Sequence, residues 1–245
     1  SRPFFPICAI RKQKVYIVIE FNQQSFFTNS DDPHLDFADQ CKLVVETVTL
    51  TPEERVSYMN DFSIVINKVY KETQTDISQN ASGDTFNITP NFPITASFWF
   101  FRKKSYEQTT ADVFDLHQEF GYSYTYDTRY KYVDPFEFLS LYINNKQVSP
   151  IIEGKLFYKY LQPVNYNLST PTKEIYMYCY GITPKEYNTG GSLDFSQIPS
   201  KSTFIKYKLN TEVVTDILNN YTFNMYHYGY NVLRFSDGYV SLAFL

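Results

Sequence analysis

The stretch that decides the fold runs from Leu50 to Lys71 and reads LTPEERVSYMNDFSIVINKVYK. Its first half has the pattern of a helix start, because Thr51 is a capping residue and Glu54 stands where a capping box needs a carboxylate. From Phe62 onward apolar side chains recur at every second residue, which is the period of a β-strand. The stretch therefore predicts a short helix over 51–61 that leads directly into a strand.

The adjacent carboxylates Glu53 and Glu54 are the first candidates for a catalytic pair. Neighbouring residues on an α-helix point about 100° apart, so the two groups cannot act on one substrate. Glu54 is better explained as the capping partner of Thr51. We expect a structural role for both carboxylates and no catalysis here.

Strand patterns occur on both sides of the helix. Two precede it, Lys14–Phe21 and Lys42–Leu50, and residues 72–89 after it are predicted to be a polar surface loop. At least eight short strands are expected after the helix, the clearest being Phe62–Lys71, Asn91–Phe101, Phe138–Val148, Lys173–Ile182, Thr203–Asn210 and the two arms of a hairpin over 231–244. Asn144-Asn145 and Asp237-Gly238 are the predicted turns. This many short strands with so few helices predicts an all-β sandwich or jelly roll.

Composition limits the function. The 245 residues carry a net charge of −4, and this lack of a basic surplus argues against direct nucleic-acid binding. No run reaches the ~18 apolar residues of a membrane span. The opening SRPFFPICAIRKQ has no signal-peptide pattern and no Met, which suggests a fragment or a processed chain.

Thiols, carboxylates and imidazoles form no diagnostic site. The chain has three widely spaced cysteines and no CxxC pair; they are Cys8, Cys41 and Cys179. We expect buried free thiols, with one disulfide and one free thiol as the alternative. The densest group of metal-ligand candidates is an acidic stretch with the residues Asp31, Asp32, His34, Asp36 and Asp39. The spacing of these side chains fits no known metal-binding motif, so we favour a solvated loop without a metal. His117 and His227 lie far from it, and no metal, cofactor or catalytic residue is predicted.

Tyrosine and asparagine patterns give two further candidates. Tyr176, Tyr178 and Tyr180 share one strand face and either stack on a ligand or pack against another sheet or subunit, and packing is commoner. A second tyrosine run covers 122–132. Four N-glycosylation sequons can be identified, at Asn80, Asn87, Asn167 and Asn220.

Several stretches, in order along the chain, resemble major capsid proteins of nucleocytoplasmic large DNA viruses. These are PFFPICAIRKQKVYIVIEF, KLVVETVTLTPEERVSYMNDFSIVINKVYKE, KEIYMYCYGITPKEYNTGGSLDFSQIP and YNVLRFSDGYVSLAF. The resemblance implies a double jelly roll of which this chain is the C-terminal part. Residues 1–50 would be the terminal strands of an incomplete first jelly roll, 51–61 a linker helix, and 62–245 an eight-stranded antiparallel second jelly roll. The region 102–134 matches no family motif and would form variable outward loops.

The resemblance implies a structural, non-enzymatic protein without cofactors. Such proteins form homotrimers of pseudo-hexameric outline that tile an icosahedral shell in the virion capsid after assembly in the host cytoplasm. The implied partners are neighbouring capsomers and minor capsid proteins, with an inner membrane near the shell through other proteins. The residues leave three alternatives: a minor capsid or scaffold paralogue, a glycan-binding jelly-roll module that uses the 122–132 tyrosines, and a metal-dependent hydrolase centred on the Asp31–Asp39 loop.

Overall fold

Strands dominate the part of the chain that the structure describes. The structure is a computed structural model, and it describes residues 4–19, 42–78, 83–104, 134–149, 155–171, 174–184 and 190–244. The chain divides into two units. Unit 1 comprises Ser1–Ile66 and Asn231–Leu245, and unit 2 comprises Asn67–Tyr230.

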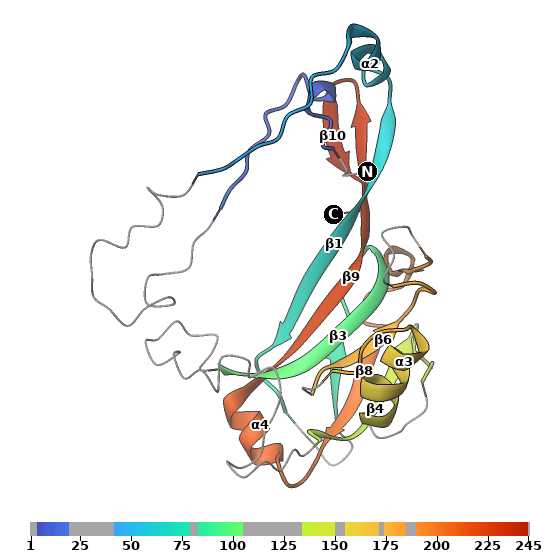
Figure 1. Cartoon of the computed structure of the whole chain (residues 1–245). Helices are drawn as coiled ribbons and strands as arrows, with labels where there is room; N and C mark the ends of the chain where they lie inside the picture. Colours follow the sequence, from blue (N-terminus) through green and yellow to red (C-terminus); the bar gives the residue numbers. More distant parts are fainter. Residues whose placement is uncertain are drawn as a thin grey trace, which may run out of the picture. The chain divides into compact units, whose positions relative to one another are not determined.

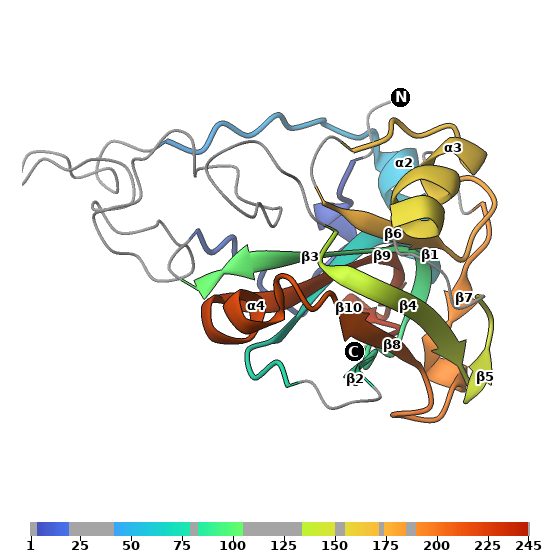
Figure 2. The same ribbon diagram turned by 90° about the horizontal axis from the view of Figure 1, so that it is seen from below.

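The described strands form two sheets (Figures 1 and 2). They are β1 (Phe62–Gln74), β2 (Asp84–Asn87), β3 (Pro93–Lys103), β4 (Phe136–Ile143), β5 (Lys146–Gln147), β6 (Tyr176–Cys179), β7 (Leu193–Asp194), β8 (Phe204–Leu209), β9 (Tyr221–Ser236) and β10 (Tyr239–Leu242). One sheet has the order β1-β9-β3-β6, with β10 beside β9 and β7 beside β3, and the other has the order β2-β8-β4-β5. Because the chain passes back and forth between two sheets, the predicted jelly roll is confirmed as the fold class.

Alternation along the strands explains why they bury one face. In β8, Ile205, Tyr207 and Leu209 are buried while the residues between them are partly exposed, as the sequence predicts. The turn at Asn144-Asn145 has both residues at positive φ, of 50° and 60°, which is the backbone of a type I′ hairpin. That turn joins β4 to β5 and confirms the prediction.

The core of unit 2 is aromatic. Trp99, Phe101 and Phe223 are almost completely buried on β3 and β9, whose register pairs Phe101 with Phe223. Phe136 of β4 and Tyr207 of β8 meet them from the other sheet, with centroid separations from Phe223 of 6.2 and 5.5 Å. These rings hold the two sheets together, because each large aromatic buries much apolar area.

A tight hairpin and a stacked aromatic pair organise unit 1. Asp237 and Gly238 have φ values of 51° and 80°, which suit the predicted Asp-Gly turn between β9 and β10. The backbone N–H groups of Arg11 and Lys12 donate to the carbonyl oxygen of Gly238, and Lys12 Nζ lies 2.7 Å from Asp237 Oδ2. This hydrogen bond lowers the pKa of the exposed Asp237 carboxyl. Phe62 and Phe235 stack at 4.6 Å.

The short helices are only partly predictable from the sequence. They are η1 (Ile7–Ala9), α2 (Pro52–Ser57), the π-helix η5 (Lys155–Leu161), α3 (Gln162–Asn165), η6 (Phe195–Gln197) and α4 (Val214–Asn220). Helix α2 confirms the prediction for 51–61, although it is shorter. The sequence did not predict η5, α3 or α4, and α4 follows Val213, which makes no side-chain cap.

Two predictions about extended segments are wrong. The described residues 14–19 and 42–50 form no strand, although their sequences alternate. A strand is stable only when it is paired in a sheet, and sequence alternation alone provides no neighbour. The expected loop over 72–89 is also wrong in part, because β1 continues to Gln74 and β2 occupies Asp84–Asn87.

Candidate functional site

Three polar side chains from three neighbouring strands meet inside unit 2. They are Glu72 of β1, His227 of β9 and Ser97 of β3. His227 Nε2 lies 2.8 Å from Glu72 Oε2, and His227 Nδ1 lies 2.8 Å from Ser97 Oγ. An ionised carboxylate can only accept, so Nε2–H donates to Glu72. Serine, imidazole and carboxylate in this order are the groups that hydrolases use for nucleophilic catalysis.

Burial argues against catalysis by these three residues. Ser97 and His227 are 0% exposed, so in this structure no substrate can reach the serine oxygen. Tyr180 lies next to the serine, with its hydroxyl 3.4 Å from Ser97 Oγ, and desolvation raises the pKa of that hydroxyl. Glu72 also accepts hydrogen bonds from the backbone N–H and the hydroxyl of Thr89. The cluster therefore connects β1, β9, β3 and the segment after β2 as a structural network.

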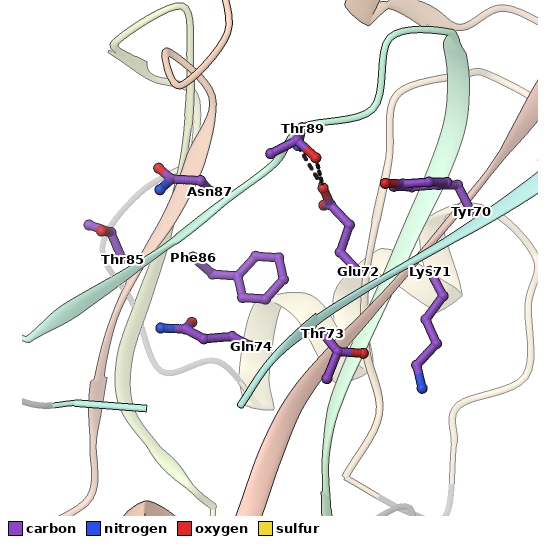
Figure 3. A pocket seen from close by; sticks show the side chains of 9 residues that line it. All are labelled: Tyr70, Lys71, Glu72, Thr73, Gln74, Thr85, Phe86, Asn87 and Thr89. Atoms are coloured by element: carbon purple, nitrogen blue, oxygen red, sulfur yellow. Dashed lines mark hydrogen bonds between the residues drawn. The ribbon is translucent and has the colours of Figure 1, made fainter. Parts of the chain in front are cut away.

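An open groove lies beside this cluster, between the end of β1 and β2 (Figure 3). Its volume is about 490 Å³, and it is lined by Tyr70, Lys71, Glu72, Thr73, Gln74, Thr85, Phe86, Asn87 and Thr89. In Figure 3 Glu72 points toward Thr89, while Lys71 points away from it on the other side of β1. Hydroxyl, amide and aromatic groups thus form most of the lining.

A second buried network surrounds an ion pair. Lys159 of η5 and Glu174 are 5% and 3% exposed in their side chains, and Lys159 Nζ lies 2.7 Å from Glu174 Oε1. The Tyr176 hydroxyl lies 2.7 Å from Asp134 Oδ1 and 3.1 Å from Glu174 Oε2. Burial and, after it, the two carboxylates raise the pKa of Tyr176 well above its usual value, so this hydroxyl stays protonated and donates.

The structure explains the helical carboxylates as the sequence predicts. Thr51 Oγ1 accepts from the backbone N–H of Glu54, and Glu54 Oε2 accepts from the N–H of Thr51 at 2.8 Å. The capping box is therefore complete, and Glu53 stands beside it in the first turn, where its charge favours the helix dipole.

The tyrosine stripe packs rather than opening to solvent. Tyr176 is completely buried, and the rings of Tyr178 and Tyr180 contact each other edge-on at 5.1 Å. Tyr180 also meets Phe195 at 5.3 Å. These contacts favour the packing alternative for this stripe.

Three of the four sequons lie in described parts of the chain. Asn87 is exposed on β2, Asn167 is exposed with φ of 54° after α3, and Asn220 is exposed and donates to Asp216. Glycosylation at these sites stays a prediction. Several other candidates lie outside the described residues, namely Asn80, Cys41, the Asp31–Asp39 loop with His34, His117, and the tyrosines of 122–132.

Burial separates the two described cysteines. Cys179 is 4% exposed, and desolvation raises the pKa of its thiol to about 12, whereas Cys8 is partly exposed. Below that pKa the thiol is protonated, and only the thiolate reacts. We expect iodoacetamide at pH 8 to label Cys8 and to leave Cys179 unlabelled in the folded protein, as measured by peptide mass spectrometry. Equal labelling rates for both would contradict this burial, and denatured protein provides the positive control.

Two classes of site can be assessed only in the described ranges. Among those residues, no group of three or more histidine, cysteine or acidic side chains lies close enough to hold a metal ion. No helix in the same ranges is long and apolar enough to cross a membrane.

The sequence did not reveal the Glu72–His227–Ser97 cluster. Glu72 and His227 are 155 positions apart, and Ser97 and His227 are 130 apart. Ser97 and His227 each stand singly in an apolar strand pattern, whereas Glu72 opens the stretch predicted to be a polar loop. A polar residue at an inward-facing strand position was the available signal, but it does not identify its partners.

A family model matches most of the chain, and solved structures share its fold. Residues 53–241 match the family model described as large eukaryotic DNA virus major capsid protein. The fold is similar to a crystal structure of PBCV-1 VP54, with a TM-score of 0.57 and 15% identity over 80% of this chain and 55% of that one. A PBCV-1 virus capsid structure has a TM-score of 0.57 and 17% identity over 80% of this chain and 55% of that one. The Faustovirus major capsid protein has a TM-score of 0.52 and 12% identity over 76% of this chain and 36% of that one. No curated protein matches the sequence.

Proposed function

The chain belongs to the family of large eukaryotic DNA virus major capsid proteins, and from this premise we propose that it is a structural subunit of a virion shell. The observation that carries the proposal is that the family match over 53–241 includes all the described strands of both sheets except the last residue of β10, Leu242. The burial of Ser97 and His227 supports a role without catalysis. The net charge of −4 supports contacts with protein rather than directly with nucleic acid.

The proposed domain organisation places the boundary at helix α2. The chain spans 55% of the length of VP54, so the proposed domains are those of a part of such a protein. We propose that 1–50 belong to a first jelly roll, 51–61 form the linker, and 62–245 form the second jelly roll. Exposed apolar side chains in the unpaired segments support this, since Val18 is 80% and Val44 is 91% exposed.

An exposed apolar helix face in unit 2 supports contact between subunits. Leu156 and Tyr160 of η5 and Val164 of α3 are 54%, 41% and 59% exposed. Such a face is typical of protein interfaces, whose centres are depleted of charge. The proposed assembly is a homotrimer of pseudo-hexameric outline that contacts neighbouring capsomers and minor capsid proteins in the virion capsid, with assembly in the host cytoplasm.

We expect the full-length protein that contains this chain to sediment as a trimer, with a mass three times that of its subunit. Replacing Leu156 and Val164 together by glutamate is expected to give monomers, because two charges would be buried in the contact. Ile182→Glu is the matched control at an exposed apolar site elsewhere, and it should leave the trimer intact.

The particle itself provides the deciding measurement. Electron microscopy of native particles should show a pseudo-hexagonal array, and peptide quantification should find this chain at the abundance of the major shell protein. The proposal would be refuted if the full-length protein stayed monomeric at about 100 µM, well above the Kd of a stable interface, and were absent from such arrays. Low abundance in an array of other subunits would instead identify a minor capsid or scaffold paralogue.

A further inference from the structure

Lys159 and Glu174 form a buried ion pair whose ammonium group has few hydrogen-bond partners. The two side chains are 5% and 3% exposed, and Lys159 Nζ lies 2.7 Å from Glu174 Oε1. An ammonium carries three N–H donors, yet among the described residues Nζ donates only to this oxygen. The Tyr160 ring is 5.7 Å from Nζ, near the outer limit of a cation–π contact. Because unsatisfied donors on a buried charge are costly, a change that removes the charge is favoured.

The Tyr176 hydroxyl favours the neutral form of this pair. It lies 2.7 Å from Asp134 Oδ1 and 3.1 Å from Glu174 Oε2, and its single proton can satisfy only one of these carboxylates at a time. If a proton of the ion pair passes from Nζ to Glu174, the carboxyl group donates to the tyrosine oxygen while the hydroxyl donates to Asp134. Both contacts are then satisfied, and Lys159 is a neutral amine beside a neutral carboxylic acid.

A neutral amine beside a neutral carboxyl group is the reactant pair of an amide bond. The neutral amine is the nucleophilic form of lysine. The short Nζ–Oε1 distance keeps this amine next to the carboxyl carbon, so the reaction needs no diffusional encounter. Water that is excluded from the pair cannot hydrolyse the product. We propose that Lys159 Nζ and Glu174 Cδ form an isopeptide bond in the folded protein.

The step is balanced by atoms that the ion pair already contains. Nζ forms a bond to Cδ, and the bond from Cδ to Oε2 breaks. The pair holds the three protons of the ammonium; one stays on the amide nitrogen, and two leave with Oε2 as water. The Tyr176 hydroxyl lies 3.1 Å from Oε2 and holds a proton on this leaving oxygen. No oxidant and no external reactant is needed, so the burial of the pair does not prevent the step.

The bond would tie the helical segment η5 to the residues that lead into β6. Glu174 follows Lys159 by 15 positions, so the bond closes a loop that includes α3. η5 is a π-helix, a rare conformation that occurs frequently at functional sites. Like a disulfide, a bond across such a loop restricts the unfolded chain and thereby stabilises the folded one. The proposed role is a permanent link between η5 and the sheet.

The test is peptide mass spectrometry of the folded full-length protein that contains this chain. A protease that cleaves before aspartate releases residues 134–193 as one peptide, which contains both Lys159 and Glu174. We expect the mass of this peptide to be about 18 Da below its sequence mass, because forming the bond releases one water. Its fragmentation should yield no ions from single backbone breaks between 159 and 174, since the bond holds the two parts together.

Two variants test the roles of the amine and of the tyrosine. Lys159→Arg keeps a positive charge beside Glu174, but its guanidinium stays protonated and does not attack, so the peptide should have its full sequence mass. Tyr176→Phe keeps the ring and removes the hydroxyl, and we expect the bond to form at least about 10-fold more slowly. The linked fraction of the peptide at successive times after synthesis measures this rate, in protein whose circular dichroism matches that of the wild type.

The Lys208–Glu137 pair is an internal control in the same digest. Its atoms lie 2.8 Å apart, but the two side chains are 26% and 47% exposed. The peptides 134–193 and 194–215, which contain the two residues, should therefore be recovered without a link between them.

Two results would overturn the proposal. One is the full sequence mass for peptide 134–193 from the folded wild-type protein, because the pair would then remain ionic. The other is a deficit of about 18 Da, one water, that persists in Lys159→Arg, because the water would then be lost elsewhere. An unchanged rate in Tyr176→Phe would overturn the part assigned to the tyrosine hydroxyl.

Discussion

Replacing Trp99 by alanine is expected to lower the free energy of unfolding by about 3–5 kcal/mol, the usual cost of removing a large aromatic from a core. Trp99 is 0% exposed, and its ring meets Tyr158 edge-on at 5.2 Å and lies nearly parallel to Tyr176 at 6.5 Å. Alanine would leave a cavity between the rings that join β3 to the helical segment η5 and to β6. Urea unfolding followed by circular dichroism measures this loss, because Trp99 is the only tryptophan and the variant would have no tryptophan fluorescence to follow.

Trp99→Phe is the matched control. The indole Nε1 is buried and has no hydrogen-bond partner among the described residues, so phenylalanine keeps an aromatic ring and removes an unsatisfied donor. We expect this variant to lose less than half of what alanine loses. A loss below about 1 kcal/mol for Trp99→Ala, within the range of surface substitutions, would show that the ring is not packed as described.

Replacing Glu174 by alanine is expected to cost about 3–5 kcal/mol, because it leaves the Lys159 ammonium buried without its counter-charge. The pair is almost completely excluded from water, and its N–O distance is 2.7 Å. The Tyr176 hydroxyl would also lose one acceptor, although Asp134 remains beside it. The measurement is again urea unfolding by circular dichroism.

Two controls separate the charge effect from lost packing. The double variant Lys159→Met with Glu174→Leu removes both charges and should be far more stable than Glu174→Ala, since apolar replacements of buried pairs are often close to neutral. Glu137 pairs with Lys208 at 2.8 Å in a much more exposed site, so Glu137→Ala should cost less than about 1 kcal/mol. Equal losses in Glu174→Ala and Glu137→Ala would contradict the burial of the Lys159–Glu174 pair.

Local patterns predicted many elements because their causes lie within a few residues. The capping box of Thr51 and Glu54, the alternation of β8, and the two hairpin turns all depend on neighbours in sequence. The jelly-roll class also followed, because many short alternating strands have few ways to bury their apolar faces.

The same local reasoning failed where a partner was required. Residues 14–19 and 42–50 alternate as strands do, yet they form none in the structure, because pairing requires a neighbouring strand. Helix α4 was missed since Val213 is no capping residue, and its stability comes instead from Ile217, which is buried in the fold.

The sequence by itself determined the period of each strand, the turns and the start of α2, and its resemblance indicated the family that the match over 53–241 then showed. Only the tertiary structure decided that Glu72, Ser97 and His227 meet. It also decided that Lys159 and Glu174 pair out of water. The physical reason is the separation in sequence between the residues that interact. Side-chain period and capping are set by adjacent residues, whereas these sites arise from strand order and from the packing of segments far apart in the chain.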